Sequence, residues 1–295
     1  SCKSISHTTK RRYTMDFIKK RTLQSCIVIL LIVTQSCNKL PEFDPLNFVR
    51  TNYEVDKRFD DSQTLNDQSP LPDIQVMSET YRVVGASDLH ITGNSEQVER
   101  FFSYTEEEDP SLVLIVGDIS NGLSHQMTSA NNQFKAWNQL PSYFVAGNHD
   151  LFFSWSQYVQ LFGSSTYTFT VHTPTATDLY IGLESGSGTL GKKQTAWLVE
   201  QLQKRYEYRH CIVFTHTNFF ARQFDTNGIY TKEERMALLS LFAQYEVSMV
   251  ISGHSHKENR TTFGNVHYIT MPPLVDGGYM VFEVEESITT RTMQL

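Results

Sequence analysis

Residues 112–118 read Leu-Val-Leu-Ile-Val-Gly-Asp, and this stretch decides the fold. Its five consecutive apolar residues predict a short strand that is buried on both faces, as strands of parallel sheets are. The glycine that follows lets the backbone bend sharply where the strand ends. Because an acidic side chain comes directly after the bend, the stretch predicts a buried strand whose carboxyl end carries a polar group.

The same pattern occurs before and after this stretch. Residues 82–87 lead into Asp-Leu-His at 88–90, and residues 143–146 lead into Gly-Asn-His-Asp at 147–150. The polar positions 88, 118 and 148 are 30 residues apart, about the length of one strand–helix–strand unit. Three parallel strands would therefore present their carboxyl ends side by side, where open α/β sheets bind ligands.

Two later apolar runs, residues 211–215 and 247–253, also end in histidines. The strand ends together offer carboxylate, amide and imidazole groups, a mixture that suits Mn, Fe, Zn or Co better than Mg or Ca. Two such ions about 3.5–4 Å apart can share a carboxylate and a hydroxide and clamp a phosphoryl oxygen. The candidate metal ligands are Asp88, His90, Asp118, Asn148, His216, His254 and His256.

The ordered set Asp-x-His, Gly-Asp, Gly-Asn-His-Asp, His and Gly-His-x-His resembles the calcineurin-like metallophosphoesterase superfamily, over residues 81–295. The resemblance implies an α/β fold, a four-layer α/β/β/α sandwich of two mixed sheets flanked by helices, with a di-metal site at the carboxyl ends of strands. It also implies two divalent or trivalent ions that share Asp118. One ion would be held by Asp88, His90, Asp118 and His256, and the other by Asp118, Asn148, His216 and His254.

The same resemblance implies an activity, the hydrolysis of phosphate esters by a hydroxide that bridges the two metals. His149 would assist the leaving group, and Asp150 would hold its imidazole in position. A small phosphodiester or a phosphomonoester is the expected substrate, and the motifs do not separate the two. Two alternatives stay open: a catalytically silent surface binding protein on the same fold, and a nuclease.

The loops that follow the strands are candidates for substrate contacts. The segment after His216 is predicted to form a wall of the substrate pocket, with aromatic faces for a base or aryl group and an arginine for phosphate. Another such loop follows Asp118. The candidate substrate-binding residues are Asn121, Asn218, Phe219 and Arg222.

The remaining strand-like segments are expected to form the second sheet, packed on the first. They have β-type composition and turn residues between them. These segments are residues 167–171, 178–183, 265–271, 278–284 and 287–293.

The first 37 residues have the features of an export signal that starts at Met15. A basic segment precedes a short apolar run at residues 26–33, and Thr-Gln-Ser-Cys follows at 34–37. The ending resembles a bacterial lipoprotein signal, so Cys37 is a candidate lipid anchor; the alternative is a signal peptide with an incidental cysteine. Residues 38–80, rich in Pro, Asp, Asn and Ser, are predicted to be a tether or loosely packed lead-in to the domain at 81–295.

The charge balance limits the partners that we expect. Without residues 1–37 the chain keeps 18 basic and 31 acidic residues, a net charge of −13. Such a surface repels a long polyanion at low salt, which disfavours long nucleic acid and a nuclease activity. The expected partners are a small phosphate ester and, through Cys37, a membrane of the cell envelope.

Overall fold

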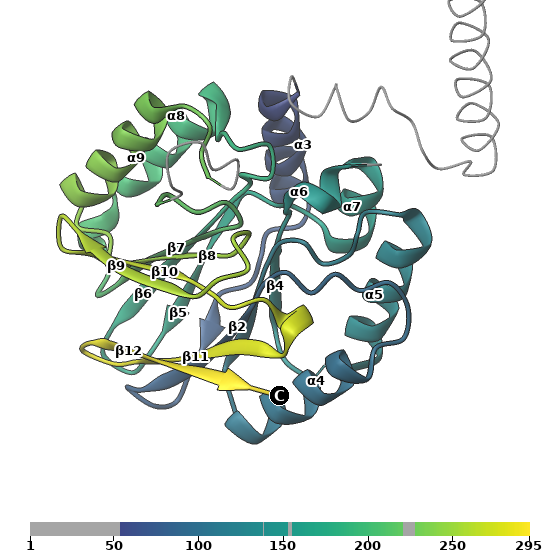
Figure 1. Ribbon diagram of the computed structural model, residues 1–295. Coiled ribbons are helices and arrows are strands. Elements are labelled where there is room, and N and C mark those ends of the chain that lie inside the picture. The colour runs from purple at the N-terminus through teal and green to yellow at the C-terminus, as the bar shows by residue number, and fades with distance from the viewer. Residues whose placement is uncertain (1–53, 138, 153–154, 221–227) are drawn as a thin grey trace, which may run out of the picture. The chain divides into compact units, whose positions relative to one another are not determined.

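The computed structural model describes residues 54–295 except 138, 153–154 and 221–227 (Figure 1). The described residues form two mixed sheets. The seven-stranded sheet has the order β1 (Ile74–Gln75), β5 (Tyr167–His172), β6 (Thr177–Leu183), β7 (Cys211–Thr215), β8 (Met249–Ser252), β10 (Val266–Thr270) and β9 (Asn259–Phe263). The five-stranded sheet has the order β12 (Ile288–Gln294), β11 (Gly278–Val284), β2 (Tyr81–Ala86), β3 (Leu112–Val116) and β4 (Ser142–Val145).

Helices cover the outer faces of both sheets, which confirms the predicted four-layer sandwich (Figure 1). Helices α8 (Gly191–Leu202) and α9 (Lys232–Gln244) pack on the seven-stranded sheet, and α4 (Glu96–Glu108) and α5 (Ser124–Trp137) pack on the five-stranded sheet. Strand β3 shows how the sequence builds these layers. Val113 and Ile115 pack with the helices, whereas Leu112, Leu114 and Val116 face the other sheet, as alternation along a strand requires.

The division of strands between the sheets differs from the prediction. Residues 278–284 and 287–293 are expected in the second sheet, but β11 and β12 belong to the sheet of β2, β3 and β4. The reason is a crossing after β10: the backbone N–H of Leu274 donates to the carbonyl of Ser87, which brings the chain to the free edge of β2. There β11 pairs antiparallel with β2, with Met280 opposite Gly85. Strand-like composition does not reveal which edge is free.

Helix α3 (Val55–Gln68) also corrects an expectation. It lies within residues 38–80, which are predicted to be loosely packed, yet it packs on α8. Its sequence is mostly polar, and its two fully buried side chains are Arg58 and Ser62. The sequence therefore has no apolar stripe from which a packed helix could be predicted. Residues 1–53, including the predicted signal and Cys37, lie outside the described residues. Among the helices of the described part, none is both long and apolar enough to cross a bilayer.

Candidate metal centre

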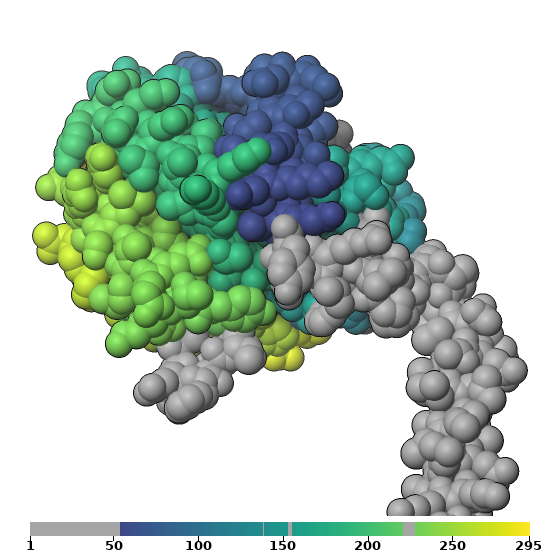
Figure 2. Space-filling model, turned by 90° about the horizontal axis from the view of Figure 1, so that it is seen from above, coloured from purple at the N-terminus to yellow at the C-terminus, as the bar shows by residue number. Residues whose placement is uncertain are grey.

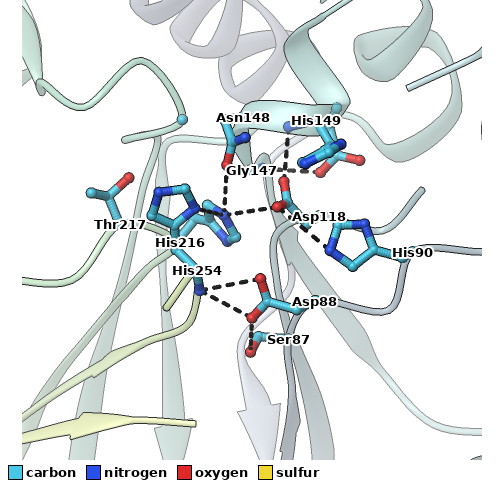
Figure 3. Close-up of polar contacts among 12 residues, drawn as sticks. Ser87, Asp88, His90, Asp118, Gly147, Asn148, His149, His216, Thr217 and His254 are labelled. Atoms are coloured by element: carbon cyan, nitrogen blue, oxygen red, sulfur yellow. Dashed lines mark hydrogen bonds and ion pairs between the residues drawn. The ribbon is translucent and has the colours of Figure 1, made fainter. Parts of the chain in front are cut away.

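The carboxyl ends of β2, β3 and β4 meet those of β7 and β8 at one end of the two sheets (Figure 3). The candidate ligands stand in the loops that directly follow these strands. Short helix α6 (Asn148–Leu151) begins at the end of β4 and carries Asn148, the candidate amide ligand. The site is therefore formed by both sheets and not by one, and the structure brings all seven candidate side chains together.

One group of candidate ligands comprises Asp88, His90 and His256. The Nε2 atom of His256 lies 3.3 Å from Oδ1 of Asp88 and 3.2 Å from Nε2 of His90. Asp88 is fully buried and is held by the hydroxyl of Ser87, 2.6 Å from Oδ2, and by the backbone N–H of His254, 3.0 Å from Oδ2. Its oxygen atoms are thus fixed before any ion binds.

A second group is formed around Asp118. Its Oδ2 atom lies 3.3 Å from Nε2 of His216, and this nitrogen lies 3.1 Å from both Nδ1 of His254 and Oδ1 of Asn148. The same Oδ2 atom lies 3.9 Å from Nε2 of His90, which belongs to the first group. Asp118 therefore stands between the groups, with His216 on one side and His90 on the other (Figure 3).

The hydrogen bonds on the far sides of two rings show that this donor set fits metal ions. Nδ1 of His216 donates to the carbonyl of Val116 at 2.9 Å, and Nδ1 of His90 lies 2.8 Å from Oδ1 of Asn121. With the hydrogen on Nδ1, each Nε2 atom presents a lone pair to the other candidate ligands. Such lone pairs repel one another unless a cation lies among them, and carboxylate, amide and imidazole groups together suit Mn, Fe, Zn or Co.

Without an ion, protons balance the charges in this cluster. Burial lowers the pKa of His216, but the charge and hydrogen bond of Asp118 outweigh burial and raise that pKa to about 10. Burial likewise raises the pKa of Asp118, but the charge of His216 overcomes this and keeps that pKa well below its usual value. Burial and the charge of His216 lower the pKa of His254 to about 4. A bound metal ion takes the place of such protons.

The backbone at the site is unusual. Five of the candidate ligands have a positive φ, a conformation that non-glycine residues rarely adopt and that costs about 1–3 kcal/mol each. These residues are Asp88 (54°), His90 (49°), Asp118 (50°), His254 (70°) and His256 (50°). Gly117 has φ 81°, and a Cβ atom there would collide with the ring of His216. Conformational strain is thus concentrated where the side chains converge.

His149 stands beside Asp118 and His90. Its ring is flanked by His90, with ring centroids 4.8 Å apart, and by Phe152, with ring centroids 4.6 Å apart. Its backbone N–H donates to Oδ1 of Asp118 at 2.9 Å. Burial lowers the pKa of His149 below its usual value. The structure thus presents the His149 imidazole at the edge of the candidate centre.

Asp150 does not hold the His149 ring, contrary to the expectation. Its buried carboxylate accepts hydrogen bonds from the backbone N–H groups of Gly147 (2.9 Å), Ile119 (3.1 Å) and Ser120 (3.3 Å). The two side chains are consecutive in α6, where neighbouring residues point in different directions. Burial and the charge of Asp118 raise the pKa of Asp150 to about 7. Through these hydrogen bonds Asp150 links the loop after β3 to the loop after β4.

The predicted substrate residues have other contacts. Phe219 is only 2% exposed and packs in the core against Phe242 and Tyr268, so it does not form a pocket wall. Oδ1 of Asn121 contacts Nδ1 of His90. Oδ1 of Asn218 accepts the backbone N–H of Phe220 at 3.1 Å, within its own loop. The sequence pattern does not show where side chains point after a strand ends. Arg222 lies outside the described residues.

Several residues at the site were not predicted. Ser87 binds Asp88, Phe152 flanks His149, and Ser185 accepts the backbone N–H of Thr217 at 2.8 Å. For Ser185 a signal exists, because Glu-Ser-Gly-Ser-Gly follows β6 and thus occupies another carboxyl strand end. Ser87 and Phe152 are adjacent to the motifs in the sequence. Their residue types alone do not indicate which side chains they contact.

We expect Asn121→Ala to weaken metal binding by about 10–100-fold, because the ring of His90 loses the group that fixes its orientation and tautomer. Competition with a chelator measures this affinity. The matched control is Asn259→Ala, on the exposed strand β9, where the side chain contacts Thr261. Equal metal affinity of Asn121→Ala and wild type would contradict the role assigned to this contact.

Comparison with known proteins agrees with the geometry. A dimetal phosphatase from Danio rerio superposes with a TM-score of 0.59 at 13% identity, over 72% of this chain and 96% of that one. The anchor in the inner membrane complex of Plasmodium superposes with a TM-score of 0.59 at 15% identity, over 73% of this chain and 84% of that one. These likenesses concern the fold. Among curated proteins, none matches the chain.

The sequence carries the family assignment. The family model described as calcineurin-like phosphoesterase matches residues 81–258, which contain all seven candidate ligands and His149. The match covers more than half of the chain. The chain therefore belongs to the calcineurin-like phosphoesterase family.

Proposed function

We propose that this protein hydrolyses small phosphate esters with the help of two metal ions, water being the nucleophile. The observation that carries the proposal is the position of Asp118 between two groups of Asp and His side chains, with the ring of His149 beside it. Membership in the calcineurin-like phosphoesterase family supports the same reaction class. No protein side chain is needed as a covalent nucleophile.

The two ions would be held by two ligand sets that share Asp118. Asp88, His90, Asp118 and His256 would hold one ion, and Asp118, Asn148, His216 and His254 would hold the other. Such ions, when bound, lower the pKa of water and offset negative charge on phosphoryl oxygens. The protein supplies buried oxygen and nitrogen atoms whose positions are fixed by Ser87, Asn121 and the carbonyl of Val116.

His149 would act on the leaving group. In its protonated form the imidazole can donate a proton to the ester oxygen as the bond to phosphorus breaks, and the ring becomes neutral in that step. The rings of His90 and Phe152 restrict the plane of the His149 imidazole, a role that Asp150 does not fill. Asp150 instead keeps the loops of Asp118 and Asn148 in register through its backbone hydrogen bonds.

Hydrolysis of p-nitrophenyl phosphate and of bis-p-nitrophenyl phosphate tests the proposal. The protein is stripped of metal, then supplied separately with Mn²⁺, Zn²⁺, Fe²⁺ or Co²⁺. We expect no turnover without metal and turnover with at least one ion. The preferred ester then identifies a phosphomonoesterase or a phosphodiesterase. Folded protein that hydrolyses neither ester with any of these ions would contradict the proposal.

The alternative is a binding protein that uses the fold without turnover. A protein of this fold is described as an anchor in an inner membrane complex, although its 15% identity carries only the fold to this chain. Calorimetry with inorganic phosphate separates the two cases. Phosphate binding to the metal-loaded protein together with no hydrolysis of either ester would favour the binding protein. The net charge of −13 after residue 37 disfavours the nuclease.

For its location, we propose an exported protein of the cell envelope, anchored by a lipid on Cys37. The proposal rests on the basic segment, the apolar run and the Thr-Gln-Ser-Cys ending of residues 15–37. Mass spectrometry of protein extracted from membranes tests it. A chain that begins at Cys37 and carries acyl groups is expected, and an unmodified N-terminus would overturn the anchor.

A further inference from the structure

The loop after β6, residues 184–188, separates two of the candidate-ligand loops; we refer to it as the β6 loop. The hydroxyl of Ser185 accepts the backbone N–H of Thr217 at 2.8 Å, and the hydroxyl of Thr217 donates to the carbonyl of Ser185 at 2.7 Å. Thr217 directly follows His216. On the other side Gly186 lies against Gly147, the residue before Asn148, so closely that a Cβ atom would come within 2.8 Å of the Gly147 carbonyl oxygen.

The β6 loop thus contacts the backbone on which Asn148 and His216 stand. Both residues belong to the ligand group of Asp118 and His254. None of the hydrogen bonds and ion pairs described for Asp88, His90 and His256 involves the β6 loop; two of them reach the other ligand group, at Asp118 and at the backbone of His254. A displacement of the β6 loop would therefore act directly on the ligand group of Asn148 and His216.

Arg58 of helix α3 holds the β6 loop at two points. Its Nε atom donates to Oε2 of Glu184 at 2.9 Å, and its Nη2 atom donates to the hydroxyl of Ser187. Glu184 uses its other oxygen to accept the backbone N–H of Gly186 at 2.7 Å. The Arg58 and Glu184 side chains are only 2% and 3% exposed. A buried ion pair of this kind is strongly destabilised when one partner is removed, because the other charge stays buried.

Helix α3 lies outside residues 81–258, the part that the family model matches. Figure 2 shows α3 in purple on the surface, side by side with green segments of the later chain. A second ion pair joins α3 to α8 at this surface, between Lys193 Nζ and Asp60 Oδ2 at 2.6 Å. This pair is half exposed and does not contact the β6 loop. Replacing Lys193 therefore tests the effect of weaker α3 docking without removing a contact to the β6 loop.

From these contacts we propose that Arg58 is a positioning residue for one of the two metal ions. It holds the β6 loop, and the β6 loop sets the separation of Asn148 and His216. The ion assigned to Asp118, Asn148, His216 and His254 depends on Arg58. The ion assigned to Asp88, His90, Asp118 and His256 does not, because the β6 loop contacts the loops of Asn148 and His216. This inference rests on the proposed two-metal function.

Metal titration of the full chain tests the proposal, with Mn²⁺ or Zn²⁺ in competition with a chelator. The test variant is Arg58→Met combined with Glu184→Gln, which removes both charges of the buried pair. We expect one of the two bound equivalents to be weakened by about 10–100-fold, the size typical of groups that orient metal ligands. The second equivalent is expected to keep its affinity. The control Lys193→Met is expected to bind both equivalents as wild type does.

Two further variants identify the affected ion and guard against misfolding. Asn148→Ala is expected to weaken the same equivalent, and its combination with the double variant should be less than additive, because the two changes act on one ligand group. Arg58→Lys retains the charge and loses the forked contact to Ser187 and Glu184. It is expected to weaken the same equivalent to a smaller extent, even if the double variant does not fold.

The outcomes separate the two proposals. Equal weakening of both equivalents, or no change in either for Arg58→Lys and the double variant, overturns the role of Arg58. Wild-type protein that binds two equivalents but hydrolyses no ester overturns the proposed function. The titration of the Arg58 variants then still decides the role of Arg58. Wild-type protein that binds fewer than two equivalents overturns both.

Discussion

Replacing Asp118 by Asn is expected to lower metal-restored turnover by roughly 10³-fold or more, at the upper end of what removal of one charge-stabilising group costs an enzyme. Oδ2 of Asp118 is 3.3 Å from His216 and 3.9 Å from His90, so this carboxylate is the one placed to serve both ions. An amide has no negative charge to share between two cations. Turnover of p-nitrophenyl esters with the preferred metal measures the loss.

The same variant is expected to fold. Asn retains an oxygen that can accept the backbone N–H of His149, and it adopts the left-handed backbone of Asp118 more readily than most residues do. Circular dichroism and urea unfolding check this. Asp109→Asn is the matched control, because Asp109 also has a positive φ, of 49°, but ends α4 away from the centre. Substantial turnover by folded Asp118→Asn would exclude a bridging role.

His149→Ala is expected to lower turnover by about 10²–10⁴-fold for esters with poor leaving groups, the usual contribution of a proton donor. The loss should be much smaller for p-nitrophenyl esters, because p-nitrophenolate leaves without a proton. Rates for alkyl, phenyl and p-nitrophenyl esters measure this dependence. The matched control is His267→Ala, on the exposed side of β10, where the ring contacts Thr262.

An equal loss for all leaving groups would assign His149 another part in the reaction. It would then offset charge on the phosphoryl group, or keep Asp118 in place through its backbone, and the proton would come from elsewhere. The leaving-group series is therefore more informative than a single rate with an activated ester.

The candidate metal centre could be predicted from the sequence because each candidate ligand lies in a loop that follows a short apolar strand. Asp118 and Asn148 come after glycines at strand ends, and parallel strands deliver such residues to one place. This local rule does not depend on which sheet a strand joins. It therefore succeeded for His216 and His254, although β7 and β8 belong to the second sheet.

Features that depend on long-range pairing could not be predicted in this way. The place of β11 is decided by the free edge of β2, and the docking of α3 by a buried Arg58 whose partner Glu184 is 126 residues away. The roles of Phe219 and Asp150 depend on side-chain direction, which the residue types do not reveal. Phe219 packs in the core, and Asp150 binds backbone N–H groups.

The pairing of β11 with β2 means that the residues matched by the family model and the residues that build the two sheets have different boundaries. A polypeptide limited to residues 81–258 would lack β10, β11 and α3, although it would contain every candidate ligand. Strands β2 and β8 would become open sheet edges, which invite aggregation, and Glu184 would keep a buried charge without its cation. The candidate ligands and the elements that support them are thus present together only in a polypeptide that extends from α3 to β12.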